Sequence, residues 1–263
     1  MSYLNNVTGT REDILTTRSV MKRGSYAILE PDGLVKNMIP GFEKCAVTIM
    51  ASPKLGASFV DYLVTAEPGG GNTKGFGNPG EEIFFYVFEG KVKVWNEDKE
   101  AEVTDGGYIY CPEGKKLYFE NIGDTDARAF LYKRLYDRVE GYEAYTVIGN
   151  INDVPWSYYE GMEDVLVKDF LPAATDLGFD MNFHILAFKQ GACHGYIETH
   201  FQEHGAYVYS GQGVYNLEND WVPVKKGDYL FMGAYCLQAA YGVGRGEDFA
   251  YIYSKDCNRD VRL

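Results

Sequence analysis

The chain is 263 residues long, 46% apolar and 15% aromatic, which allows one large buried core or two of ordinary size. Its 25 basic and 38 acidic residues give a net charge of −13, which argues against nucleic acid and against an anionic membrane surface as partners. The chain has no apolar run long enough to span a membrane, and its N-terminal segment lacks the apolar stretch of a secretory signal. We therefore expect a cytoplasmic protein without a membrane partner.

The cysteines are odd in number, and none of them forms a C-x-x-C pair. A disulfide framework or a zinc site would need paired cysteines, so we interpret them as reduced thiols. The five are Cys45, Cys111, Cys193, Cys236 and Cys257.

A repeat with a period of 121 residues relates the two halves of the chain, beginning at Phe84 and at Gly205. Each copy alternates apolar residues between glycine-containing turns, which is typical of short strands. The equivalent pairs include Gly90 and Gly211, Val103 and Val224, Gly106 and Gly227, Tyr108 and Tyr229, and Tyr132 and Tyr253.

The repeat and the many Tyr, Phe, Val and Gly residues predict a mainly β protein with two jelly-roll β-barrel domains in tandem. We place these domains at residues 1–145 and 146–263, with the join between 140 and 155. Two stretches outside the repeat, from Thr10 to Arg18 and from Glu160 to Leu171, are expected to be helical.

Glycines gather at positions 69–71 and recur at Gly75, Gly77 and Gly80. A phosphate-binding loop would end in Lys followed by Ser or Thr and lead into a helix, and this segment does neither. We expect a flexible loop at the mouth of a barrel.

All four histidines lie between positions 184 and 204, and the tightest group is the segment E-T-H-F-Q-E-H from Glu198 to His204. On a strand, Glu198 and His200 would leave the same face, and His204 is also at an even offset. One carboxylate and two imidazoles directed at one point form a metal-ligand set, although a strand with surface polar residues would give the same spacing.

The second half resembles the cupin motif G-x5-H-x-H-x3-E-x6-G, with Glu198, His200 and His204 at the H, H and E positions. In the second cupin motif, Gln238 stands where the last metal-binding histidine is usual. The resemblance implies a bicupin whose second barrel binds a metal through Glu198, His200, His204 and Gln238.

The first half resembles the second cupin motif, but its metal positions carry no side-chain ligand. These positions fall on Gly77, Pro79, Ile83 and Leu117. Two nearby carboxylates, Glu81 and Glu82, are out of register. We expect a first barrel without a metal.

Several segments resemble the (S)-ureidoglycine aminohydrolase family of allantoin degradation over essentially the whole chain. They are SYLNNVTGTRED near the start, NMIPGFE from Asn37, LGASFVDYLV from Leu55, GFDMNFHIL from Gly178, HGYIETHFQEHGAYVYSGQGVYNL from His194 and YSKDCNRD near the end. This resemblance implies hydrolysis of (S)-ureidoglycine to (S)-ureidoglycolate and ammonia, with Mn(II) as cofactor, a small ureide as substrate and a homo-oligomer as the assembly. Carboxylate, amide oxygen and imidazole ligands also suit a hard cation such as Mn(II).

The resemblance implies three further site residues, Tyr215, Tyr251 and Lys255. We expect Lys255 to pair with the substrate carboxylate and the two tyrosines to hydrogen-bond the carboxylate or the ureido group. Each tyrosine has the alternative role of a barrel-lining aromatic.

The group that transfers the proton stays open at this stage. Glu198 is a candidate base if one oxygen is free of the metal. We predict Glu198, Tyr251 and Lys255 as the catalytic residues. Asp180 and His184 are alternatively hydrogen-bonded barrel residues, and His194 matches no ligand position.

Two rival functions are compatible with the fold, because cupins carry many activities. Two imidazoles and a carboxylate also suit Fe(II) and a dioxygenase reaction. A non-catalytic bicupin that binds a small molecule is the other alternative, although it would not need the complete ligand set.

Overall fold

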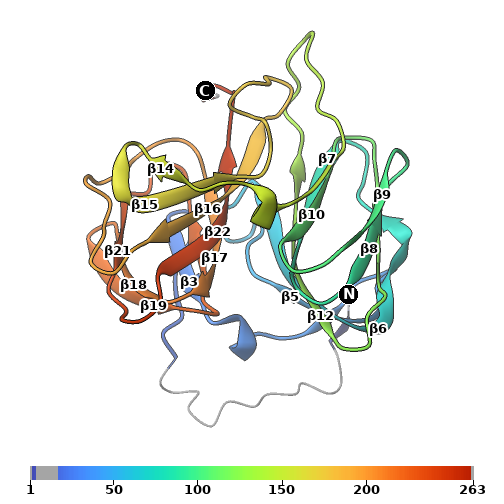
Figure 1. Cartoon of the computed structure of the whole chain (residues 1–263), viewed down its shortest axis with the longest axis horizontal. Coiled ribbons are helices and arrows are strands. Elements are labelled where there is room, and N and C mark those ends of the chain that lie inside the picture. The colour runs from blue at the N-terminus through green and yellow to red at the C-terminus, as the bar shows by residue number, and fades with distance from the viewer. Residues whose placement is uncertain (1, 4–16, 262–263) are drawn as a thin grey trace. The chain divides into compact units, whose positions relative to one another are not determined.

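The computed structural model describes residues 2–3 and 17–261, and these residues are almost entirely strands joined by turns (Figure 1). Within them, helical structure is limited to two short 3₁₀ turns, η2 (Pro31–Gly33) and η3 (Ile151–Asp153). No helix in this part of the chain is long and apolar enough to cross a membrane. The helix expected from Thr10 to Arg18 falls mostly on residues 10–16, which lie outside the described residues.

Contacts divide the chain into two compact units. The described part of unit 1 comprises residues 2–3, 33–53 and 58–153, and that of unit 2 comprises residues 17–32, 54–57 and 154–261. The chain thus passes into unit 2 after Asp153, whereas the expected boundary followed residue 145, because residues 147–150 still pair with a strand of unit 1.

Unit 1 contains one large antiparallel sheet. Its main order is β1-β4-β5-β6-β12-β7-β10-β13, while β11 joins β6 to β8, and β8 pairs with β9. The strands are β1 (Ser2–Tyr3), β4 (Asn37–Met38), β5 (Glu43–Ile49), β6 (Phe59–Phe76), β7 (Glu81–Glu89), β8 (Val92–Trp95), β9 (Glu100–Val103), β10 (Gly107–Cys111), β11 (Leu117–Asn121), β12 (Ala127–Leu135) and β13 (Val147–Asn150).

The expected flexible loop at residues 69–80 is wrong for most of its length, because β6 continues through it to Phe76. Gly71 pairs with Glu43 on one side and with Glu120 on the other. A Cβ atom at Gly71 would lie 2.1 Å from the carbonyl oxygen of Phe119. The glycine therefore permits close strand approach rather than mobility.

The core of unit 1 is apolar at the positions where the motif would place metal ligands. Ile83 and Leu117 are fully buried in it. The two nearby carboxylates make other contacts: Glu81 pairs with Lys133 at 2.8 Å, and Glu82 accepts a hydrogen bond of 2.6 Å from the Tyr110 hydroxyl. These contacts give both carboxylates structural partners.

Unit 2 contains an eight-stranded sheet in the order β14-β15-β16-β22-β17-β20-β3-β2 and a three-stranded sheet in the order β19-β18-β21. The strands are β2 (Val20–Lys22), β3 (Tyr26–Leu29), β14 (Ser157–Tyr159), β15 (Met162–Asp169), β16 (Met181–Phe188), β17 (His204–Ser210), β18 (Gln212–Leu217), β19 (Asp220–Lys225), β20 (Tyr229–Met232), β21 (Gln238–Gly242) and β22 (Phe249–Asp256).

The helix expected from Glu160 to Leu171 is wrong, because this segment forms β15. Its residues pair with β16 from Val165, opposite Phe188, to Asp169, opposite His184. Val165 is fully buried in the core of unit 2. Sheet pairing and burial thus override the weak helical preference of the local sequence.

Equivalent strand pairings show that the 121-residue repeat is structural. In unit 1, β7 lies between β12 and β10, and in unit 2, β17 lies between β22 and β20. The paired glycines adopt positive φ in both copies: 103° at Gly90 and 68° at Gly211, then 86° at Gly106 and 94° at Gly227. These turns need glycine because other residues are strained at such angles.

Candidate active site

The predicted metal ligands come together where the segment before β17 meets the start of β21. Glu198 and Gln238 form an antiparallel bridge, in which each backbone N–H donates to the other's carbonyl, at 2.8 and 3.0 Å. His204 is the first residue of β17, whereas Glu198 and His200 lie in irregular chain. The expectation that all three share a strand is therefore wrong, and the bridge to Gln238 positions Glu198 instead.

The four side chains are neighbours. Nε2 of His200 lies 3.8 Å from Oε2 of Glu198 and 3.3 Å from Nε2 of Gln238. The His200 and His204 rings meet edge to face, with centroids 5.0 Å apart.

Both imidazoles are held by backbone carbonyls through Nδ1. His200 Nδ1 donates to Gln202 O at 3.1 Å, and His204 Nδ1 donates to Ser254 O at 2.7 Å. A carbonyl only accepts, so Nδ1 carries the proton in each ring and Nε2 carries the lone pair, which in His200 faces the amide nitrogen of Gln238 at 3.3 Å. This is the orientation that outer partners impose on metal-binding histidines.

Burial and the neighbouring His200 lower the pKa of His204 to about 3, which keeps its imidazole neutral. Burial alone would raise the pKa of Glu198, but the His200 imidazole and the Tyr159 hydroxyl bring it down to about 2. The site thus holds an ionised carboxylate beside a neutral imidazole, which are the protonation states that a metal ion needs.

The ligand atoms suit a hard divalent cation, but the four side chains are not arranged as a complete set of metal ligands. Within the described residues, no three His, Cys, Asp or Glu side chains are arranged to hold a metal ion. Gln238 turns its amide nitrogen toward His200, so rotation of the amide would be needed to present its oxygen.

A small cavity of unit 2, of about 10 Å³, adjoins three of these ligands and all three additional site residues expected from the resemblance. His200 does not line it. The lining residues are Tyr159, Leu186, His194, Glu198, His204, Tyr215, Met232, Gln238, Tyr251, Tyr253 and Lys255.

Two buried tyrosines form one wall of this cavity. The rings of Tyr215 and Tyr251 have centroids 5.8 Å apart, and their hydroxyls hydrogen-bond each other. Burial raises the pKa of both hydroxyls well above the usual value, so they remain neutral. Lys255, opposite Asn182 in the β16–β22 register, contributes the cation.

The other candidate residues have different surroundings. His184 hydrogen-bonds Asp169 through Nδ1 at 2.7 Å and stacks on Tyr253, outside the cavity lining. Asp180 is fully buried. His194 lines the cavity together with three of the ligands, although it matches no ligand position.

Tyr159 was not among the predicted site residues. Its hydroxyl donates a hydrogen bond of 2.9 Å to Oε1 of Glu198. No spacing in the sequence distinguishes it among the 22 tyrosines of the chain.

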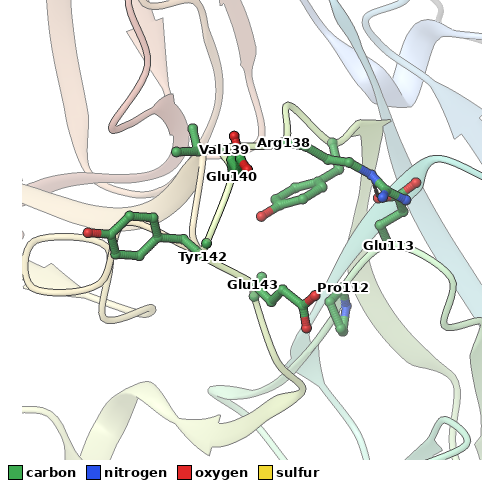
Figure 2. Close-up of a pocket in the computed structure, with 10 residues that line it drawn as sticks. Pro112, Glu113, Arg138, Val139, Glu140, Tyr142 and Glu143 are labelled. Carbon is green, nitrogen blue, oxygen red and sulfur yellow. Dashed lines mark hydrogen bonds and ion pairs between the residues drawn. The ribbon is translucent and has the colours of Figure 1, made fainter.

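A wider cavity of about 790 Å³ lies in unit 1 beside the turn from Val139 to Tyr142 (Figure 2). Its lining has three carboxylates and no imidazole. Its single cation, Arg138, is bonded to Glu113 at 2.7 Å. The smaller cavity of unit 2 therefore suits an anionic substrate and a metal ion better.

Comparison with known proteins assigns the family. A cupin domain model matches residues 62–132. Over all 263 residues, the chain is 61% identical to (S)-ureidoglycine aminohydrolase from Escherichia coli (strain K12) and covers the whole of that protein. The chain belongs to the (S)-ureidoglycine aminohydrolase family.

Two solved structures resemble this family member over nearly its full length. Protein Ylba from E. coli has a TM-score of 0.86 and 56% identity, covering 97% of this chain and 100% of its own. The putative glyoxylate-induced protein from Pseudomonas aeruginosa has a TM-score of 0.87 and 28% identity, covering 100% and 98%. The predicted family and bicupin fold are confirmed.

Proposed function

We propose that the chain hydrolyses (S)-ureidoglycine to (S)-ureidoglycolate and ammonia. The observation that carries this proposal is its full-length identity of 61% with a curated enzyme of that name. The cavity of unit 2 supports it, because one small space combines three of the four expected ligands with a cation and neutral hydrogen-bond donors.

The proposed cofactor is Mn(II), held by Glu198, His200, His204 and Gln238. The unprotonated Nε2 atoms of the two histidines and the ionised carboxylate support this ligand set. When bound, the metal supplies positive charge and Lewis acidity for an anionic substrate.

Lys255 is proposed to bind the substrate carboxylate. Burying an ammonium group beside a cavity costs free energy unless it pairs with an anion. The net charge of −13 repels an anionic substrate at long range, so a cation in the site is needed to attract the substrate. The neutral Tyr215 and Tyr251 hydroxyls suit the uncharged ureido group.

The proposed reaction proceeds by elimination and addition at the carbon that bears the amino group. The C–N bond to the amino group breaks and its electron pair leaves with the amino nitrogen, which takes up the proton that the ureido nitrogen releases and departs as ammonia. An imine remains. Water then adds across the imine, giving the hydroxyl of the product at carbon and returning one proton to the ureido nitrogen. Fixing one face of the imine through Lys255 and the tyrosines accounts for a single stereoisomer.

Glu198 is better suited to bind a cation than to move the proton. Tyr159 occupies its Oε1 at 2.9 Å, and a carboxylate whose pKa is about 2 is a weak base at neutral pH. We therefore propose a ligand role for Glu198 in place of the role of general base.

The test is ammonia release from freshly generated ureidoglycine by chelated protein, before and after Mn(II) is added back. The expected result is release of ammonia and formation of the S product only with metal present. Absence of release with every divalent metal tested would overturn the proposal, and metal-dependent oxygen uptake would favour a dioxygenase instead.

A further inference from the structure

His194 is held in the cavity wall by two hydrogen bonds to the backbone of β21, one through its own backbone N–H and one through its ring. Its N–H donates to the carbonyl of Ala240 at 3.0 Å, and the N–H of Ala240 donates to Nδ1 of the ring at 3.2 Å. Because the backbone N–H is a donor, Nδ1 must accept. The proton of the neutral ring is therefore on Nε2.

The Nε2–H group of His194 has no hydrogen-bond partner among the described residues, although the atom is buried. The whole residue is only 6% exposed. Buried donors are normally paired, and an unpaired one marks a position where a bound molecule can supply the acceptor. His194 lines the same cavity as Glu198 and Lys255.

Strand pairings place His194 at the tyrosine end of the cavity. Its partner Ala240 lies opposite Tyr215 in the β18–β21 register. The ring of Phe188 contacts both His194 and Tyr251, with centroid distances of 5.1 and 6.1 Å. The cation Lys255 is four residues beyond Tyr251 on β22, roughly 13 Å along the strand between Cα atoms.

The residues that line the cavity therefore differ in charge between the Lys255 side and the tyrosine side. A charged donor at Lys255 suits a carboxylate, whereas the neutral donors around Phe188 suit an uncharged carbonyl oxygen. Burial lowers the pKa of His194, which keeps the ring neutral.

We propose that His194 binds the substrate by donating a hydrogen bond from Nε2–H to the ureido carbonyl oxygen. This inference rests on the proposed function and assigns the end of the substrate that His194 recognises. His194 acts as a binding residue that fixes the ureido group while Lys255 holds the carboxylate.

Two substitutions separate this role from a purely structural one. In His194→Asn the amide oxygen replaces Nδ1 and keeps the bond from Ala240, but the Nε2 donor is lost. In His194→Gln the amide nitrogen reaches the Nε2 position, but the acceptor for Ala240 is lost. The Asn variant thus removes the Nε2 donor, and the Gln variant removes the Nδ1 acceptor.

The experiment measures KM and kcat for ammonia release by the Mn(II)-loaded wild type and both variants. We expect His194→Asn to raise KM about tenfold and His194→Gln to stay within about threefold, since one neutral hydrogen bond changes. The opposite order, or an unchanged His194→Asn, would overturn the inference. An inactive wild type would overturn the proposed function, and with it this inference.

A second measurement requires no variant. In protein labelled with ¹⁵N-histidine and loaded with diamagnetic Mg(II), addition of (S)-ureidoglycolate should shift the His194 Nε2–H signal and slow its exchange with solvent. Binding of the product that leaves this signal unchanged would overturn the inference even if both variants failed to fold.

Discussion

The Tyr159 hydroxyl and Oε1 of Glu198 are joined by a hydrogen bond of 2.9 Å that links residues 39 positions apart. Tyr159 is the last residue of β14, an edge strand of unit 2. The bond limits rotation of the carboxylate and stabilises its ionised form. The Tyr159 hydroxyl is therefore positioned as an outer partner that orients the proposed metal ligand Glu198.

Tyr159→Phe should weaken Mn(II) binding about tenfold, because loss of an outer partner frees the ligand to rotate. Competition with a chelator of known affinity measures this change. Tyr158→Phe is the matched control, since Tyr158 is 58% exposed. Equal affinities for the two variants would show that the contact does not support metal binding.

Lys255→Met should raise KM for ureidoglycine by about tenfold or more in metal-loaded enzyme, because a charge-assisted hydrogen bond to the carboxylate is lost. Steady-state ammonia release gives the value, and Lys255→Arg should recover part of the affinity by restoring the charge. Lys189→Met controls for loss of one positive charge, since Lys189 bonds the Glu163 carbonyl away from the cavity. An unchanged KM in Lys255→Met would exclude the assigned role.

The strand framework could be predicted because its signals are local. Gly90 and Gly211 mark equivalent turns whose positive φ values require glycine, and apolar alternation between such turns fixes the strand faces. The ligand set followed from motif spacing. Its geometry did not, because Glu198 is positioned by a bridge to Gln238, which is distant in sequence.

Tyr159 and the donor role of His194 could not be predicted, since both depend on tertiary contacts. Tyr159 reaches Glu198 only because β14 pairs with β15, in the segment where a helix was expected. The His194 tautomer is set by the Ala240 N–H, and no sequence pattern specifies that contact.

Arg18→Ala should destabilise the protein by about 2 kcal/mol, because it leaves a buried carboxylate without its cation. Arg18 makes two bonds to Asp228, of 2.6 and 2.7 Å, and Asp228 is 2% exposed. Denaturant unfolding measures the change. Lys22→Ala is the control, since the Lys22–Asp220 pair is solvent-exposed and should contribute little. Equal stability of the two variants would show that Arg18 does not anchor the N-terminal strands to β20.

The metal-free protein should lose stability as the pH falls below about 6.5, the ordinary pKa of histidine. Burial lowers the pKa of both His194 and His204, in the latter to about 3. The unfolded chain therefore binds protons that the folded chain excludes, and each imidazole contributes up to about 1.4 kcal/mol per pH unit. For His204 this loss continues down to about pH 3.

Unfolding by denaturant at pH 7.5, 6.5 and 5.5, in the presence of chelator, measures how steeply the free energy of unfolding falls with pH. His194→Asn removes one of the two titrating groups while keeping the bond from Ala240. Its stability should fall less steeply than that of the wild type between pH 6.5 and 5.5. If the stability of the wild type and of His194→Asn fell equally steeply with pH, His194 would become protonated in the folded protein. Its ring would then not be neutral at the acidic end of the range.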